Sequence, residues 1–146
     1  MFKWIDLPPL WLLLFLFLAF TMPRGPELFY EQALMGQCFV AVGVIFMIVA
    51  VYQMQRHKTT VIPHRTASTL VTTGIFSQTR NPIYLGDTFV LAGGLFYWQA
   101  HLPALILVPA FMWVITQRFI KPEEERLLAA FGDAFKTYCD TTRRWL

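Results

Sequence analysis

The sequence predicts an all-α polytopic membrane protein, with about four transmembrane helices and a C-terminal cytoplasmic amphipathic helix. Hydrophobic residues make up 56% of the 146 residues and charged residues only 14%, whereas a soluble globular domain carries about 25% charged residues. The apolar residues gather in four segments, and Lys and Arg are concentrated in alternate connections between them. We therefore expect a single integral membrane domain over residues 1–146.

Each apolar segment approaches the length that a helix needs to cross a bilayer, roughly 20 residues for a core of about 30 Å. The predicted transmembrane helices are 7–22, 33–54, 82–98 and 102–120. Pro8 and Pro9 suit the first turn of the first helix, where a backbone N–H has no partner. No small-residue cleavage site follows this helix, so we expect it to be retained rather than removed as a signal peptide. Pro109 should kink the fourth helix or mark an irregularity in its backbone.

The placement of Lys and Arg predicts the orientation in the membrane. The loop 55–81 and the tail 121–146 are rich in both, and the short link 99–102 contains neither. Because positive residues stay on the cytoplasmic side, we expect the loop and both termini to be cytoplasmic. The basic pI, about 9.1, then reflects attraction to anionic membrane lipid. Nucleic-acid binding would need a soluble basic surface with base-reading groups, which the sequence does not supply.

Metal and transport sites have little support in the sequence. Cys38 lies in an apolar run and Cys139 in the polar tail, so we expect neither a disulfide nor a metal site. The three histidines are scattered and suggest no metal site. A small transporter would need ionisable residues deep within its spans. Asp87, near the start of the third helix, is the one residue that comes close.

The end of loop 55–81 carries the first group of polar residues that suggest chemistry. The loop exceeds the usual limit of about 12–15 residues and leads into Arg80, Asn81 and Pro82. Pro82 forces Asn81 away from helical geometry and can open the next helix. Arg80 and Asn81 then lie at a helix N-terminus on the membrane surface, where free N–H groups and a guanidinium can bind an anion. Alternatively, Arg80 anchors the helix to lipid phosphates and Asn81 only caps it.

The tail carries the second group. Apolar residues recur there at helical spacing, at Leu127, Leu128, Phe131 and Phe135. Glu123, Glu124 and Glu125 precede them, and Gly132 ends or interrupts the helix. Acidic residues are favoured at a helix start by its dipole. They could instead lie beside Arg80 and bind a cationic ligand or sugar hydroxyls.

Two motifs in these segments resemble the isoprenylcysteine carboxyl methyltransferase and phospholipid methyltransferase superfamily, in its small bacterial members. The first is 70–76 (Leu-Val-Thr-Thr-Gly-Ile-Phe) followed by 80–86 (Arg-Asn-Pro-Ile-Tyr-Leu-Gly). The second comprises Pro122-Glu123-Glu124, then Phe131-Gly132, Tyr138 and Arg143-Arg144-Trp145. The resemblance covers about half of the chain, residues 59–146.

The resemblance implies an integral membrane enzyme, located in the bacterial inner membrane. Such an enzyme uses S-adenosylmethionine and releases S-adenosylhomocysteine. Its acceptor would be a lipid or another lipophilic small molecule, methylated at the cytoplasmic face. The residues implied for cofactor binding are Gly74, Arg80, Asn81, Pro82, Tyr84, Glu123 and Glu124. Arg80 and Arg118 are the basic residues expected to act as catalytic groups. At the position of Asn81, many family members have His instead.

The expected chemistry agrees with the residues. Methyl transfer from a sulfonium needs positioning and exclusion of water more than an acid or a base. Carboxylates suit the amine or ribose of such a donor, and Arg80 suits its carboxylate. The rival hypothesis is a membrane protein without methyltransferase activity, and cofactor binding separates the two.

Overall fold

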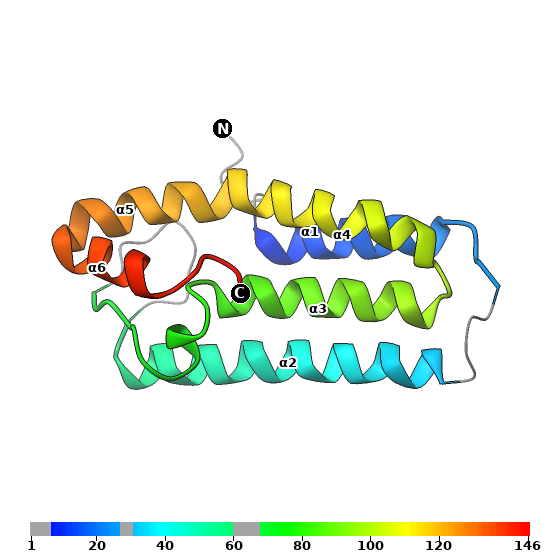
Figure 1. The fold of residues 1–146 in the computed structure, drawn as a ribbon, viewed down its shortest axis with the longest axis horizontal. Helices are drawn as coiled ribbons and strands as arrows, with labels where there is room; N and C mark the ends of the chain where they lie inside the picture. The colour runs from blue at the N-terminus through cyan, green and yellow to red at the C-terminus, as the bar shows by residue number, and fades with distance from the viewer. Residues whose placement is uncertain (1–6, 27–30, 60–67) are drawn as a thin grey trace.

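The computed structural model describes residues 7–26, 31–59 and 68–146. The elements in chain order are α1 (Pro8–Thr21), α2 (Gln32–Arg56), the 3-10 turn η1 (Gly74–Ser77), α3 (Pro82–Tyr97), α4 (His101–Ile115), the π turn η2 (Thr116–Ile120), α5 (Lys121–Phe131) and α6 (Asp133–Thr141). The described residues form helices and no strand (Figure 1), so the all-α prediction is confirmed.

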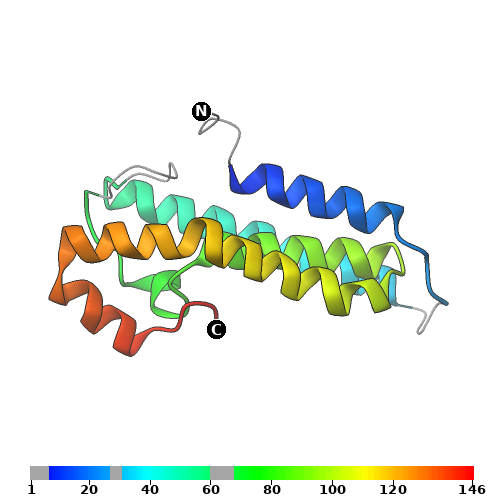
Figure 2. The same ribbon diagram turned by 90° about the horizontal axis from the view of Figure 1, so that it is seen from above.

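Helix α3 lies at the centre of the bundle. It has α2 on one side and the pair α1 and α4 on the other, as the two ribbon views show (Figures 1 and 2). Helices α5 and α6 and the turn η1 gather at one end, beyond the start of α3. This end holds both motifs that the sequence singled out.

Glycines bring α2 and α3 into backbone contact. A Cβ atom added to Gly43 would lie 2.5 Å from the carbonyl oxygen of Gly86, and one added to Gly36 would lie 2.7 Å from that of Gly93. Small residues allow this close approach between helices in membranes. The pair Gly93-Gly94 predicts such close helix packing from the sequence, and the structure confirms it.

The other side of α3 forms the main apolar core. Leu91 and Leu95 have no exposed surface, and neither do Phe111 and Ile115 of α4. The ring of Phe15 in α1 meets that of Phe111 edge-on, with 5.3 Å between the centroids. Tight packing of α1, α3 and α4 therefore positions the start of α3 relative to η2 and α5.

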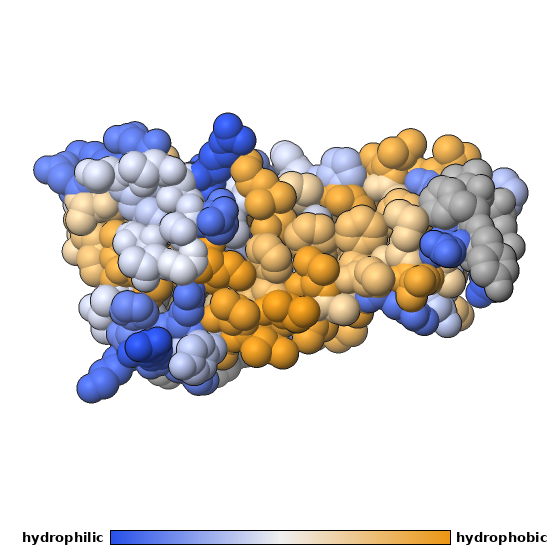
Figure 3. All heavy atoms as spheres, turned by 60° about the horizontal axis from the view of Figure 1, so that its bottom comes forward, coloured by the Kyte–Doolittle hydropathy of each residue, from blue (hydrophilic) through white to orange (hydrophobic). Residues whose placement is uncertain are grey.

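Large apolar side chains also cover the outside of the bundle. Examples are Phe17, Ile48, Leu105 and Trp113, which are 62–74% exposed. Figure 3 shows an apolar band across the middle of one face, with polar residues towards both ends. Two helices are long and apolar enough to cross a membrane, Gln32–Arg56 and His101–Phe131, and α1 is a shorter apolar helix.

The fourth predicted helix differs from the structure at its end. It does not stop at residue 120 but continues through η2 into α5. Pro109 lies within regular α4, and the irregularity is the π turn η2. Pro122 has no N–H, and its ring would clash with the carbonyl of Arg118 in a regular α-helix; the wider turn accommodates it. Helix α5 begins at Lys121 with Glu123 and Glu124 in its first turn, as expected. Because it continues from α4 through η2, it has no free helix end there, and a helix dipole does not explain these glutamates.

Reporter fusions can test the predicted orientation. The link between α3 and α4 lies at the opposite end of the bundle from α5 and α6 (Figure 1). A reporter inserted at Gln99 and one fused after Leu146 should therefore report opposite sides of the membrane, with Leu146 cytoplasmic. A C-terminal reporter that is active outside the cytoplasm would contradict the four-helix topology.

Candidate functional site

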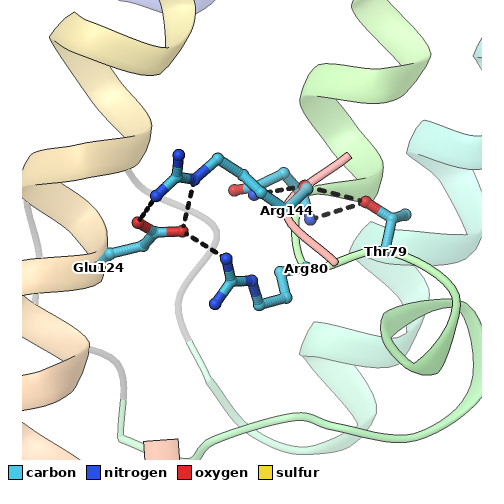
Figure 4. Close-up of polar contacts among 5 residues, drawn as sticks. Thr79, Arg80, Glu124 and Arg144 are labelled. Atoms are coloured by element: carbon cyan, nitrogen blue, oxygen red, sulfur yellow. Dashed lines mark hydrogen bonds and ion pairs between the residues drawn. The ribbon is translucent and has the colours of Figure 1, made fainter. Parts of the chain in front are cut away.

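Three segments that are distant in the sequence meet at the polar end of the bundle. They are residues 79–84 entering α3, the first turn of α5, and the C-terminal residues 142–145 (Figure 4). The nitrogen Nη2 of Arg80 lies 3.2 Å from Oε1 of Glu124. The structure thus brings together the two motifs that the sequence placed in one pocket.

Glu124 is held between two arginines. The Arg144 guanidinium donates two hydrogen bonds to it, from Nε to Oε1 at 2.9 Å and from Nη2 to Oε2 at 2.6 Å. This hydrogen bonding is the main reason why the pKa of Arg144 is raised. The side chains of Arg80 and Glu124 are only 12% and 18% exposed, so the contact between this guanidinium and this carboxylate is partly shielded from water.

The backbone of the tail completes the junction, which is the meeting of residues 79–84, the first turn of α5 and residues 142–145. The carbonyl of Arg143 accepts a hydrogen bond from the Arg80 N–H at 3.0 Å. The carbonyl of Arg144 accepts one from Asn81 Nδ2 at 2.9 Å and one from Thr79 Oγ1 at 3.3 Å (Figure 4). The side chain of Asn81 therefore binds the tail and does not cap α3, while Pro82 opens that helix as predicted.

Sequence reasoning missed this role of the tail, because Arg143 and Arg144 stand out only as part of the family motif. The available signal was a basic pair close behind an amphipathic helix that begins with acidic residues. The pairing itself depends on the turn at Gly132, whose φ of +53° ends α5 and lets α6 fold back. Trp145 then packs against the main core.

Tyr84 and Glu123 form a second contact between the two motifs. The Tyr84 hydroxyl donates a hydrogen bond to Oε2 of Glu123 at 3.2 Å. The ring of Tyr84 is buried and lies against Phe119 of η2, with 6.4 Å between the centroids. Both residues were predicted for the site, and the structure joins Tyr84, one turn further along the chain than Arg80, to Glu123 in the first turn of α5.

The loop beside this junction is shaped by Gly74. Its φ is +61°, and a Cβ there would collide with the side chain of Gln53, whose Oε1 accepts a hydrogen bond from the Ile75 N–H at 3.1 Å. Tyr138 of α6 donates a hydrogen bond to the Phe76 carbonyl at 2.6 Å. From the sequence, an aromatic residue such as Tyr138 in a basic tail is expected to lie in the lipid headgroup layer. The structure instead buries Tyr138 within this end of the protein. This burial raises the pKa of its hydroxyl.

Arg118 has a different neighbour. Its guanidinium carbon lies 5.3 Å from the centre of the Trp11 ring, a cation–π contact. The structure therefore places Arg118 against α1, whereas Arg80 joins Glu124 and Arg144. The two basic residues predicted as catalytic groups lie in separate surroundings.

The site offers both kinds of charge to a ligand. Nε of Arg80 is buried and has no hydrogen-bond partner among residues 7–26, 31–59 and 68–146, and the same holds for Arg126 one turn along α5. Buried donors in native proteins nearly always have partners, so these nitrogens are donors available to an anionic group. The carboxylate of Glu123 supplies the complementary charge. This combination suits a ligand that carries both a carboxylate and a cation.

Comparison with known proteins gives one match. The sequence model of a family described as phospholipid methyltransferase matches residues 32–134, more than half of the chain. No curated protein and no solved structure matches. The matched region contains Arg80, Tyr84, Glu123 and Glu124, while α1 and the tail with Arg144 lie outside it. The chain belongs to the phospholipid methyltransferase family, and this membership together with its apolar helices indicates a membrane methyltransferase.

Proposed function

We propose that this protein is an S-adenosylmethionine-dependent methyltransferase that acts at the cytoplasmic membrane face on a lipid or another lipophilic small acceptor. The observation that carries the proposal is the junction of Arg80 and Tyr84 with Glu123 and Glu124. It lies at the polar end of a bundle whose outer surface is apolar. A polar cofactor can reach this end from the cytoplasm, and a lipophilic acceptor can approach from the bilayer.

The residues fit S-adenosylmethionine. Its carboxylate would pair with Arg80, whose buried Nε has no partner in the described part of the chain. Its ammonium group or ribose hydroxyls would bind Glu123. Bound there, the cofactor supplies an electrophilic methyl group on a positively charged sulfur. Glu124 and Arg144 would hold Arg80 in place, and Gly74, Asn81 and Pro82 would fix the backbone around it.

The proposed arrangement in the membrane has four spans, α1 to α4, with both termini cytoplasmic, in a bacterial inner membrane. Helix α1 has 14 residues, which corresponds to about 21 Å at 1.5 Å per residue. This is shorter than a hydrocarbon core of about 30 Å, so the bilayer would thin locally around it. Arg118 then lies at the cytoplasmic edge of α4, where it would face the acceptor beside α1.

Ligand binding tests the proposal. Purified protein in detergent should bind S-adenosylhomocysteine, and a ligand at 100 times its dissociation constant should add about 2.7 kcal/mol of stability, measured as a thermal shift. Adenosine is the matched control, because it lacks the carboxylate and ammonium that Arg80 and Glu123 would bind. Absence of any shift at millimolar S-adenosylhomocysteine in a folded sample would favour a membrane protein without catalytic activity.

A further inference from the structure

Helix α3 buries a carboxylate that the junction does not use. Asp87 is 5% exposed, and no hydrogen bond or ion pair joins it to another residue in the described parts of the chain. By helical periodicity it shares a face with Leu91 and Gly94. Leu91 is fully buried, and Gly94 adjoins Leu16 of α1. Asp87 therefore lies on the side of α3 that packs towards α1.

Such a group lowers the stability of the fold. Removing a carboxylate from water costs free energy that only a close partner offsets. An ionisable residue inside a membrane-spanning helix is accordingly a marker of function. An apolar residue at this position would pack against α1 without that cost.

The position of Asp87 relative to the junction indicates what it contacts. Tyr84, one turn earlier on the same face of α3, binds Glu123. Asp87 therefore lies one turn farther from the cytoplasmic end than the groups proposed to hold the cofactor. A lipophilic acceptor would come from the bilayer and meet the cofactor from that deeper side.

We propose that Asp87 is a catalytic residue that binds the amine of the acceptor and takes a proton from it; this rests on the proposed function. A positively charged ammonium would neutralise Asp87, whereas an acceptor carboxylate would be repelled. The Asp87 carboxylate takes one proton from the ammonium, which frees the nitrogen lone pair. The nitrogen then forms a bond to the methyl carbon, and the C–S bond breaks with its electron pair going to sulfur. The products are a methylated ammonium, S-adenosylhomocysteine and protonated Asp87, which releases its proton to water.

The test uses the full-length protein in vesicles of total polar lipid extract, with labelled S-adenosylmethionine. A matched set of vesicles has its lipid amines acetylated. The parent protein should label the lipids of the first set and not the second. Asp87→Asn, which keeps the shape but cannot take the proton, should lose at least about 100-fold of the labelling rate, the usual minimum for a general base.

Two further measurements separate catalysis from structure. Asp87→Asn should bind S-adenosylhomocysteine within about twofold of the parent, and its melting temperature should be equal or higher because a buried charge has been removed. Glu125→Gln, an exposed carboxylate on α5, is the control and should change none of the three readouts.

Several outcomes would overturn the proposal. The first is labelling by Asp87→Asn at the parent rate. The second is labelling by the parent protein that survives amine acetylation or is absent from both vesicle sets. The third is a fall in the melting temperature of Asp87→Asn together with loss of ligand binding. A folded parent that binds no S-adenosylhomocysteine would remove the proposed function and this role together. Normal ligand binding with any of the other results would refute the role of Asp87 alone.

Discussion

Replacing Glu124 by glutamine should weaken binding of S-adenosylhomocysteine by at least about tenfold. The substitution removes the charge that Arg80 and Arg144 share, so Arg80 is no longer held towards the ligand. A hydrogen bond to a charged group contributes roughly 1.5–3 kcal/mol, which sets the expected size of the effect. Arg80→Ala should cause a loss of the same order. Isothermal titration calorimetry on detergent-purified variants measures both.

Glu125→Gln is the matched control for these variants, since Glu125 is exposed on the same turn of α5. Circular dichroism should show unchanged helicity in all three. If Glu124→Gln and Arg80→Ala both bind like the parent, the junction only ties the tail to α3 and the ligand binds elsewhere. If Glu125 proves critical while Glu123 and Glu124 do not, the acidic pair has been assigned one residue too early.

Gly43→Val should strongly destabilise the packing of α2 on α3. Its first added carbon would lie 2.5 Å from the Gly86 carbonyl and 3.1 Å from the Phe89 Cβ, so α2 and α3 must separate. Overpacking of a close-packed site typically costs about 1–3 kcal/mol and sometimes more. Thermal unfolding in detergent, followed by circular dichroism, measures the change.

Ala41→Val adds two methyl groups to the same helix at an exposed position. It should alter stability by no more than about 0.5 kcal/mol. A Gly43→Val protein as stable as this control would show that α2 and α3 are not locked together by their glycines.

Much of the fold could be predicted because bilayer crossing and backbone contact leave direct signals in sequence. The start of α3 follows from Pro82, and the close packing at Gly93 follows from its lack of a side chain. The continuity of α4 and α5 could not be predicted. The residues change from apolar to charged at Lys121, and in sequence such a change looks the same as the end of a helix. The backbone hydrogen bonds that continue a helix do not depend on that change.

The candidate site was predictable only in outline. The meeting of Arg80 with Glu124 follows from two motifs at neighbouring ends of a helical hairpin, and the structure shows that contact. The hydrogen bonds of Asn81 and the burial of Tyr138 depend on where the tail returns after Gly132. That path is set by tertiary packing of α6 on η1, which local patterns do not encode. The cofactor-binding roles themselves stay predictions.

The π turn η2 also fixes how the acidic pair, Glu123 and Glu124, is rotated about the helix axis relative to α4. Helices α4 and α5 are continuous through η2, and every residue added to a regular α-helix turns the following side chains by about 100°. A π turn accommodates one extra residue, so η2 sets the direction in which Glu123 and Glu124 point. Deleting Gln117 alone would close η2 into a regular α turn, in which the Pro122 ring clashes with the Arg118 carbonyl. The resulting kink would move both carboxylates away from Tyr84 and Arg80, with all the site residues still present. The length of residues 116–120 is therefore as much a part of the site as the identity of its side chains.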